Sequence, residues 1–304
     1  MKDSKDIEKH LIDLMLGHSI PQDEYADVAK QIHRLLIEKG IDTFTNPHKP
    51  LGKGKNTYST STEPKTDVVF IHDGTKYRCS IKKDESAYLV SCNSSADFIT
   101  QFVTIHDGLN RLQPDMIDDL YKAADYIKKV PNYNSYHKGY QKEDRLEDFI
   151  ADKFMPKAQK LVGSAQAKMM AEHISSKYSD PAQQRAYSDY LHDAESFIQA
   201  TLKKLLTSYT QYSKEVIFEL VTGKIKFPNS DCSCTHLLSS EGVFELTGPS
   251  CEYVDRVYSK FIQANKIGRL QNVPRKTINK KVMKTNDLDT IADSFAIADL
   301  TFKI

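Results

Sequence analysis

The chain has 304 residues, with 39% hydrophobic and 27% charged side chains, and its 42 basic and 41 acidic residues give a net charge of +1. This length can bury a substantial core in one large domain or two ordinary ones. The chain contains no apolar run long enough to span a membrane, and its charge balance excludes attraction to nucleic acid through net charge alone. We therefore expect a soluble, cytoplasmic protein without a membrane partner, because the charged N-terminal residues also lack the apolar region of a signal peptide.

The first predicted element is an amphipathic helix over residues 22–39, which ends before Gly40. The following residues, 45–65, are rich in Ser, Thr, Lys, Pro and Gly and predict a loop. Its basic part contains Lys49, Lys53 and Lys55. We expect these lysines to bind phosphates of a nucleic acid, with a solvated connecting loop as the alternative interpretation.

A β-hairpin is predicted next. Asp67 opens the apolar run 68–71, Asp73-Gly74 favours a tight turn, and residues 77–81 form the returning strand. This layout places Asp67 near Lys82 across the hairpin. A carboxylate can hold Mg²⁺, and a neighbouring ammonium group can orient one of the waters that the ion retains.

The hairpin resembles the PD-(D/E)xK nuclease superfamily, in which a metal-binding Asp begins one strand and a (D/E)xK triplet ends the next. Asp67 matches the first element, and Ser80-Ile81-Lys82 stands where the triplet is expected, with Ser80 in place of the second acid. The segment Glu63-Pro-Lys-Thr-Asp67, followed by Ser80-Ile-Lys-Lys83, also resembles a group of tailed-phage proteins that share this nuclease-like core. The match covers about twenty-five residues.

The resemblance implies an α/β (α+β) fold with a mixed central sheet of restriction-endonuclease-like type flanked by helices. It also implies Mg²⁺, or Mn²⁺, as cofactor and DNA as partner. Asp67 would bind the metal and Lys82 would orient the attacking water. The second acid would come from Glu24 or Glu38 in the first helix, or from Glu219. The turn after the lysine would place Ser91 and Asn93 beside phosphate, although such residues also commonly cap helices.

The rest of the chain predicts a large helical insertion. The pattern is helical from Pro114 to Gly223, and Pro181 marks a helix start. The stretch from there to Gly223 predicts either one helix of roughly 60 Å or two packed helices. Short β-type segments follow at 222–227, 235–238, 243–247 and 298–304. We divide the chain into a nuclease-like part (1–110), a helical insertion or subdomain (111–222) and a β-containing part that completes the core (223–304).

Glu219 has two interpretations. In the tailed-phage group a Glu followed by Thr-Gly and Lys-Phe recurs, which implies that Glu219 supplies the acid that Ser80 does not. Alternatively, this segment is an ordinary helix end closed by Gly223.

Two functions remain open from the sequence. The first is a phage-type, Mg²⁺-dependent nuclease or nuclease-like DNA-processing protein that acts in the infected host cell. The second is a non-catalytic virion or assembly component on a nuclease-like scaffold, which binds DNA or another phage protein. Because a fold does not fix a function, the absent second acid strengthens the second hypothesis, while the nuclease remains the first interpretation.

Overall fold

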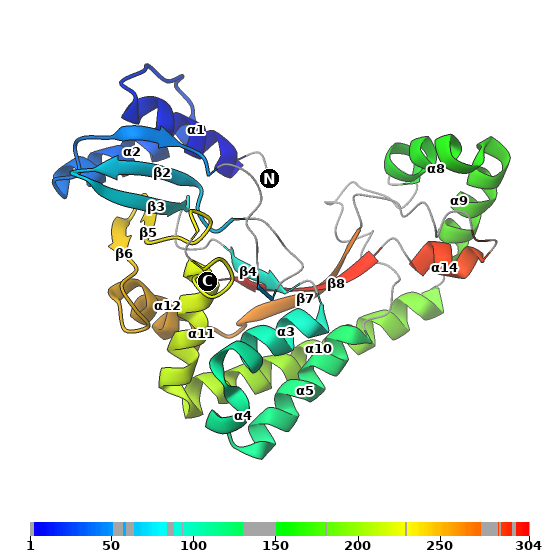
Figure 1. Cartoon of the computed structure of the whole chain (residues 1–304). Coiled ribbons are helices and arrows are strands. Elements are labelled where there is room, and N and C mark those ends of the chain that lie inside the picture. The colour runs from blue at the N-terminus through cyan, green and yellow to red at the C-terminus, as the bar shows by residue number, and fades with distance from the viewer. Residues whose placement is uncertain are drawn as a thin grey trace.

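A computed structural model describes residues 3–50, 57–58, 64–83, 88–92, 94–129, 150–179, 181–228, 230–274, 285, 287–293 and 296–303. The fold is mixed α/β, with a five-stranded sheet, a three-stranded sheet and helices between and around them (Figure 1). Within these ranges, no helix has both the length and the apolar character needed to cross a bilayer.

The five-stranded sheet is mixed, with the order β1-β2-β3-β5-β6. Neighbouring strands are antiparallel except for β3 and β5, which are parallel. The strands are β1 (Thr45–His48), β2 (Val68–His72), β3 (Thr75–Ile81), β5 (His236–Ser239) and β6 (Gly242–Glu245).

The predicted hairpin is confirmed as β2 and β3. Val68 pairs with Cys79 at one end and His72 with Thr75 at the other. Asp73 and Gly74 form the turn with φ angles of 47° and 76°, the left-handed conformation that two-residue hairpin turns require. The predicted loop over 45–65 is wrong at its start, because residues 45–48 form the edge strand β1. Pro47 is compatible with this position, since an edge strand leaves half of its backbone groups outside the ladder.

Helices cover both faces of this sheet. On one face lie α1 (Asp3–Met15) and α2 (Glu24–Glu38), and α2 confirms the helix predicted over 22–39. The Asp23 side chain caps α2 by accepting a hydrogen bond from the Ala26 N–H at 2.7 Å. The core between these two helices and the sheet contains Ile7, Leu11, Ile32, Leu36, Val68, Phe70, Ile81 and Leu238. On the other face, α11 (Thr210–Thr222) and α12 (Glu252–Gln263) enclose Leu237 and Phe244.

The C-terminal strand belongs to a second sheet. The segment predicted over 298–304 is strand β8 (Ala296–Lys303), which lies between β4 (Tyr88–Cys92) and β7 (Gly268–Pro274) in an antiparallel arrangement. The main sheet is instead extended late in the chain by β5 and β6.

The helices of the predicted insertion pack into a large core that also includes residues from both flanking segments. Phe98, Leu202 and Phe261 all belong to this core. The helices involved are α3 (Ser95–Phe102), α5 (Pro114–Lys128) and α10 (Pro181–Ser208), with η1 (Thr104–His106) and α4 (Gly108–Arg111) between α3 and α5. The helical conformation is interrupted at Tyr209, which has φ −134° and ψ 60°, so α10 and α11 are two helices rather than one.

A smaller cluster lies at the far end of α10, at the right of Figure 1. It comprises η2 (Ile150–Phe154), α8 (Met155–Val162), α9 (Ser164–Ser179) and α14 (Leu288–Asp293). Phe154, Ile174 and Ile291 form its own core.

The β-type segment predicted over 222–227 is wrong. Thr222 ends α11, Gly223 is left-handed with φ 62°, and the next residues form turns. The Glu219 carboxylate accepts hydrogen bonds from the N–H groups of Ile225 and Lys226, so these groups fold back onto the helix instead of joining a sheet.

Candidate functional site

Asp67 lies against the end of β3. Its N–H donates to the Cys79 carbonyl at 2.8 Å, and its Oδ2 accepts hydrogen bonds from the Ile81 N–H at 2.7 Å and the Ser80 hydroxyl at 3.2 Å. Ser80 is 4% exposed. Ser80, which stands where the resemblance leads us to expect a second acid, therefore binds Asp67 directly.

Lys82 is the residue after Ile81, at the end of β3. Its N–H donates to the Leu238 carbonyl at 2.9 Å, which extends the pairing of β3 with β5 by one residue. The positive charge of Lys82 favours the thiolate of Cys234, and the negative charge of Asp67 disfavours it. Asp67 and Lys82 therefore act on a common neighbour, the buried Cys234 thiol, whose pKa burial raises to about 12.

A further acid that the sequence analysis did not select is Glu8 in α1. Its side chain is 11% exposed, and Oε2 pairs with the Lys49 ammonium group at 2.7 Å. Burial raises the pKa of Glu8, and the negative charge of Asp67 raises it further, while Lys49 lowers it. The effect of Asp67 shows that the two carboxylates interact electrostatically. The sequence signal was the spacing of Ile7 and Leu11, which predicts a buried helix face beside Glu8.

The two helix acids selected from sequence lie on the surface of α2. Glu24 pairs with Lys83 at 3.5 Å, and its side chain is 64% exposed. Glu38 pairs with Arg34 at 3.4 Å, one helical turn away. Both acids therefore form solvated ion pairs, which typically contribute little to stability.

Glu219 is buried at 2% exposure near the end of α11. Oε1 accepts hydrogen bonds from the Tyr58 hydroxyl at 3.0 Å and the Lys226 N–H at 2.9 Å, and Oε2 accepts one from the Ile225 N–H at 2.8 Å. Burial raises the pKa of Glu219, whereas these hydrogen bonds and the charge of Lys65 lower it. The carboxylate thus fixes the turn after α11.

The buried Lys65 senses the charges of both Glu219 and Lys82. Burial, together with the positive charges of Lys226 and Lys82, lowers the pKa of the Lys65 ammonium group to about 8, against smaller opposing effects of Cys234 and Glu219. The next residue, Thr66, is 2% exposed, and its hydroxyl has no hydrogen-bond partner among the described residues.

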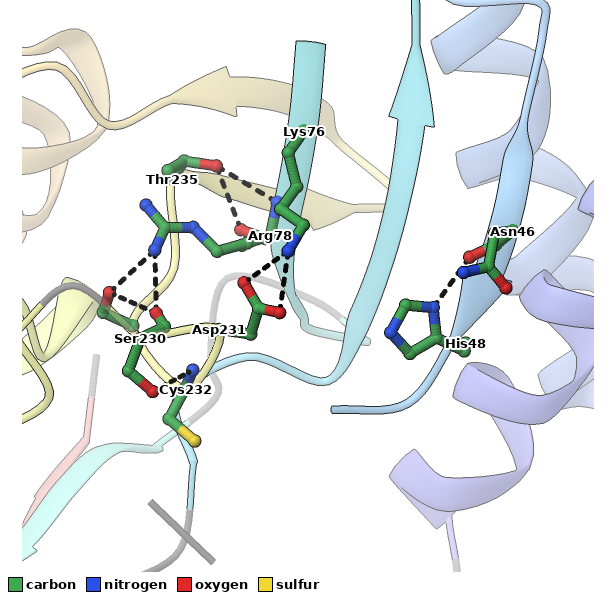
Figure 2. Close-up of polar contacts among 9 residues, drawn as sticks. Asn46, His48, Lys76, Arg78, Ser230, Asp231, Cys232 and Thr235 are labelled. Atoms are coloured by element: carbon green, nitrogen blue, oxygen red, sulfur yellow. Dashed lines mark hydrogen bonds and ion pairs between the residues drawn. The ribbon is translucent and has the colours of Figure 1, made fainter. Parts of the chain in front are cut away.

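The loop 230–235 holds this segment in place. The Cys232 carbonyl accepts the N–H of Lys65 at 2.8 Å and that of Thr66 at 3.3 Å. Figure 2 shows how β3 anchors the loop: Arg78 donates to the Ser230 carbonyl at 2.7 Å, and Lys76 binds both carboxylate oxygens of Asp231. The strand that carries Ser80 therefore also positions the backbone leading to Asp67.

The residues selected for nucleic-acid binding are only partly described. Lys49 pairs with Glu8, whereas Lys53, Lys55 and Asn93 lie outside the described residues. Ser91 lies in β4, opposite Thr301 of β8. Ser94, three residues after Ser91, caps α3 by accepting a hydrogen bond from the Asp97 N–H at 3.1 Å.

Within the described residues, no group of three or more His, Cys, Asp or Glu side chains is arranged to hold a metal ion. The acids that interact beside the hairpin are the pair Asp67 and Glu8. Comparison of the chain with protein-family models, with curated proteins and with solved structures finds no match.

Proposed function

We propose that this chain is a Mg²⁺-dependent nuclease or nuclease-like DNA-processing protein of the PD-(D/E)xK type. The observation that carries the proposal is that the Asp67 carboxylate is held at the end of β3, one residue before Lys82, where its charge also acts on the carboxylate of Glu8. The two acids come from α1 and from the start of the β2–β3 hairpin. The mixed sheet with helices on both faces supports the restriction-endonuclease-like assignment.

The donor set is compatible with Mg²⁺. This ion retains several waters and is commonly held by one or two carboxylates together with substrate phosphates. Asp67 and Glu8 would hold it here, and Mn²⁺ would fit the same oxygen ligands. When bound, the ion supplies charge neutralisation at the phosphate and a more acidic water.

The chain's own residues have separate roles in this proposal. Ser80 and Ile81 orient the Asp67 carboxylate through Oδ2. Lys49 neutralises part of the charge of Glu8, which limits the repulsion between the two acids in the absence of a cation. Lys82 contributes a positive charge that orients water and stabilises negative charge developing on the phosphate.

The second candidate function is a non-catalytic virion or assembly role on the same scaffold. The observation that favours it concerns residue 80, which is a serine rather than an acid. The Ser80 hydroxyl donates a hydrogen bond to the Asp67 carboxylate, so this carboxylate has a partner within the protein itself. In that case the lysines of this region would bind DNA or another phage protein without cleavage.

A cleavage assay separates the two functions. Duplex, single-stranded and branched DNA are incubated with the wild-type protein, Asp67→Asn and Lys82→Met, each with Mg²⁺ or Mn²⁺. We expect metal-dependent cleavage by the wild type and loss of at least a hundredfold in both variants, with Glu24→Gln as the surface control. Absence of cleavage by the wild type on every substrate with either metal would refute the nuclease function and favour the scaffold role.

A further inference from the structure

Lys49 forms an ion pair that joins two elements beside the proposed metal site. Its Nζ lies 2.7 Å from Oε2 of Glu8, and among the described residues no other side chain hydrogen-bonds to this carboxylate. Glu8 belongs to α1, whereas Lys49 directly follows β1, the edge strand of the main sheet. The pair therefore connects one proposed metal ligand to a lysine that the sequence selects for phosphate binding.

Packing brings Glu8 and Asp67 to the same region of the fold. Ile7, Val68 and Ile81 belong to one hydrophobic core, in which α1 packs on the sheet. Ile7 precedes Glu8 in the sequence, and Val68 follows Asp67. The negative charge of Asp67 acts on Glu8 in addition to the charge of Lys49. Because like charges repel, a cation beside these two acids stabilises them.

The two members of the ion pair differ in their freedom to move. The side chain of Glu8 is 11% exposed, whereas that of Lys49 is 45% exposed. The backbone before Lys49 is held in place: His48 pairs with Val69 of β2, and its Nδ1 donates to the Asn46 carbonyl at 2.7 Å (Figure 2). Rotation of the flexible lysine side chain can therefore break the ion pair without a change in the fold.

A divalent cation would compete with this ammonium group for Glu8. Mg²⁺ or Mn²⁺ binds carboxylate oxygens directly and carries twice the charge of an ammonium group. A cation held by Glu8 and Asp67 would repel Lys49, which contacts the same Glu8 carboxylate. The half-exposed lysine can then turn outward, where a phosphate of bound DNA is an alternative anion.

We propose that Lys49 is an exchangeable counter-ion of Glu8: a divalent cation displaces its ammonium group, which then binds a phosphate of the nucleic-acid backbone. This inference rests on the proposed function and deepens it, because it makes phosphate binding by Lys49 depend on the metal. A lysine binds phosphate as a point charge, so the released side chain needs no rigid, preformed geometry at its second partner.

Calorimetric titration with Mn²⁺ measures the displacement without any substrate, at a pH of about 8 where glutamates are ordinarily ionised. We expect Lys49→Met to bind Mn²⁺ about tenfold more tightly than the wild type, because the metal no longer has to displace a cation. Lys49→Arg keeps the charge and should bind within about threefold of the wild type. Lys266→Met is the matched control and should bind as the wild type does, because Lys266 is 53% exposed and forms a similar ion pair with Glu195 at 2.6 Å.

Fluorescence anisotropy with a labelled DNA duplex, at several salt concentrations, measures the phosphate contact. One series is in chelator, and the other is in Ca²⁺ at a concentration that displaces Mn²⁺ in the calorimeter, with the integrity of the duplex checked on a gel. In chelator, Lys49→Met should bind as the wild type does, since Glu8 retains the lysine. In Ca²⁺, its slope of log K against log salt should be smaller than that of the wild type by about 0.9.

Mn²⁺ affinity in Lys49→Met that is equal to that of the wild type, or weaker, would overturn the displacement even if the wild type cleaves DNA. Equal losses of DNA affinity in chelator and in Ca²⁺ would overturn the exchange, because Lys49 would then contact phosphate permanently. An unchanged salt slope in both series would overturn the transfer to phosphate.

The failure of this inference and the failure of the proposed function are distinguishable. Absence of Mn²⁺ binding by both the wild type and Lys49→Met would refute the metal site and the exchange together. Tighter Mn²⁺ binding by Lys49→Met, with no cleavage of any DNA by the wild type, would support the displacement and refute the nuclease function.

Discussion

Ile81 donates its backbone N–H to Oδ2 of Asp67 over 2.7 Å. This bond joins the residue before β2 to the last residue of β3, and it places Lys82 one residue beyond the carboxylate. Asp67 is consequently both a proposed metal ligand and a structural acceptor. Substitutions of Asp67 have to be chosen so that loss of metal binding can be separated from loss of these hydrogen bonds.

Asp67→Ala and Asp67→Asn should differ in stability. Alanine removes the acceptor of the Ile81 N–H and the Ser80 hydroxyl, and we expect a cost of about 1–3 kcal/mol in the free energy of unfolding. Asparagine retains an oxygen acceptor and should cost less than about 1 kcal/mol. Urea denaturation measures both. Equal stability of Asp67→Ala and wild type would show that these hydrogen bonds contribute nothing to folding.

Glu219 should matter more to stability than its position on a helix suggests. Glu219→Ala would leave the N–H groups of Ile225 and Lys226, the second of them buried, without their acceptor, and we expect a cost of about 2–4 kcal/mol. Glu38→Ala, which removes an exposed pair with Arg34, should cost less than about 0.5 kcal/mol. Comparable midpoints for the two variants in urea would contradict the structural role of Glu219.

Gly223 and Gly74 should respond differently to alanine. Both have positive φ, but a Cβ at Gly223 would meet Cγ of Lys65 at 2.7 Å, whereas a Cβ at Gly74 has no atom within 4 Å. We expect Gly74→Ala to cost about 1 kcal/mol for its backbone conformation and Gly223→Ala to cost at least about 1 kcal/mol more. If thermal and urea unfolding gave the same loss for both variants, the close approach of Lys65 to the end of α11 would be wrong.

His106 should make stability depend on acid pH. Burial lowers the pKa of its imidazole from 6.5 to about 4; nearby, Glu215 raises the pKa and Arg111 lowers it. Between these values the unfolded chain binds more protons than the folded one, so stability should fall as pH drops from 6.5 toward 4, by up to about 1.4 kcal/mol per pH unit.

His106→Phe keeps a ring against Tyr212 and should flatten this slope, whereas His18→Gln, at an exposed residue, should not. The measurement is urea unfolding at several pH values. A slope in His106→Phe as steep as in the wild type would contradict burial of a neutral imidazole.

Local patterns predicted the elements whose signals are contained in a few residues. The Asp73-Gly74 turn, the strands around it and helix α2 follow from turn chemistry and apolar spacing. The turn after α11 was missed because its conformation depends on Glu219, whose carboxylate captures two backbone N–H groups six and seven residues later. Strand β1 was missed because its pairing with β2 outweighs a loop-like composition.

The candidate site likewise combines residues placed by local patterns with residues placed by long-range packing. Asp67 and Lys82 are separated by a single hairpin, so strand alternation alone brings them to one end. Glu8 reaches the site through the packing of α1 on the sheet. The spacing of Ile7 and Leu11 predicts a buried helix face but not which part of the sheet that face covers, so the sequence analysis favours Glu24 and Glu38 in place of Glu8.

The most direct test of the central claim is a calorimetric titration with Mn²⁺ alone, because it measures the metal site independently of any substrate. We expect one site in the wild type, at least a tenfold weaker affinity in Asp67→Asn and in Glu8→Gln, and wild-type affinity in Glu24→Gln, whose residue pairs with Lys83 at the surface. A wild-type site that persists unchanged in both Asp67→Asn and Glu8→Gln, or no saturable binding at all, would contradict the assignment of these two acids as the metal ligands.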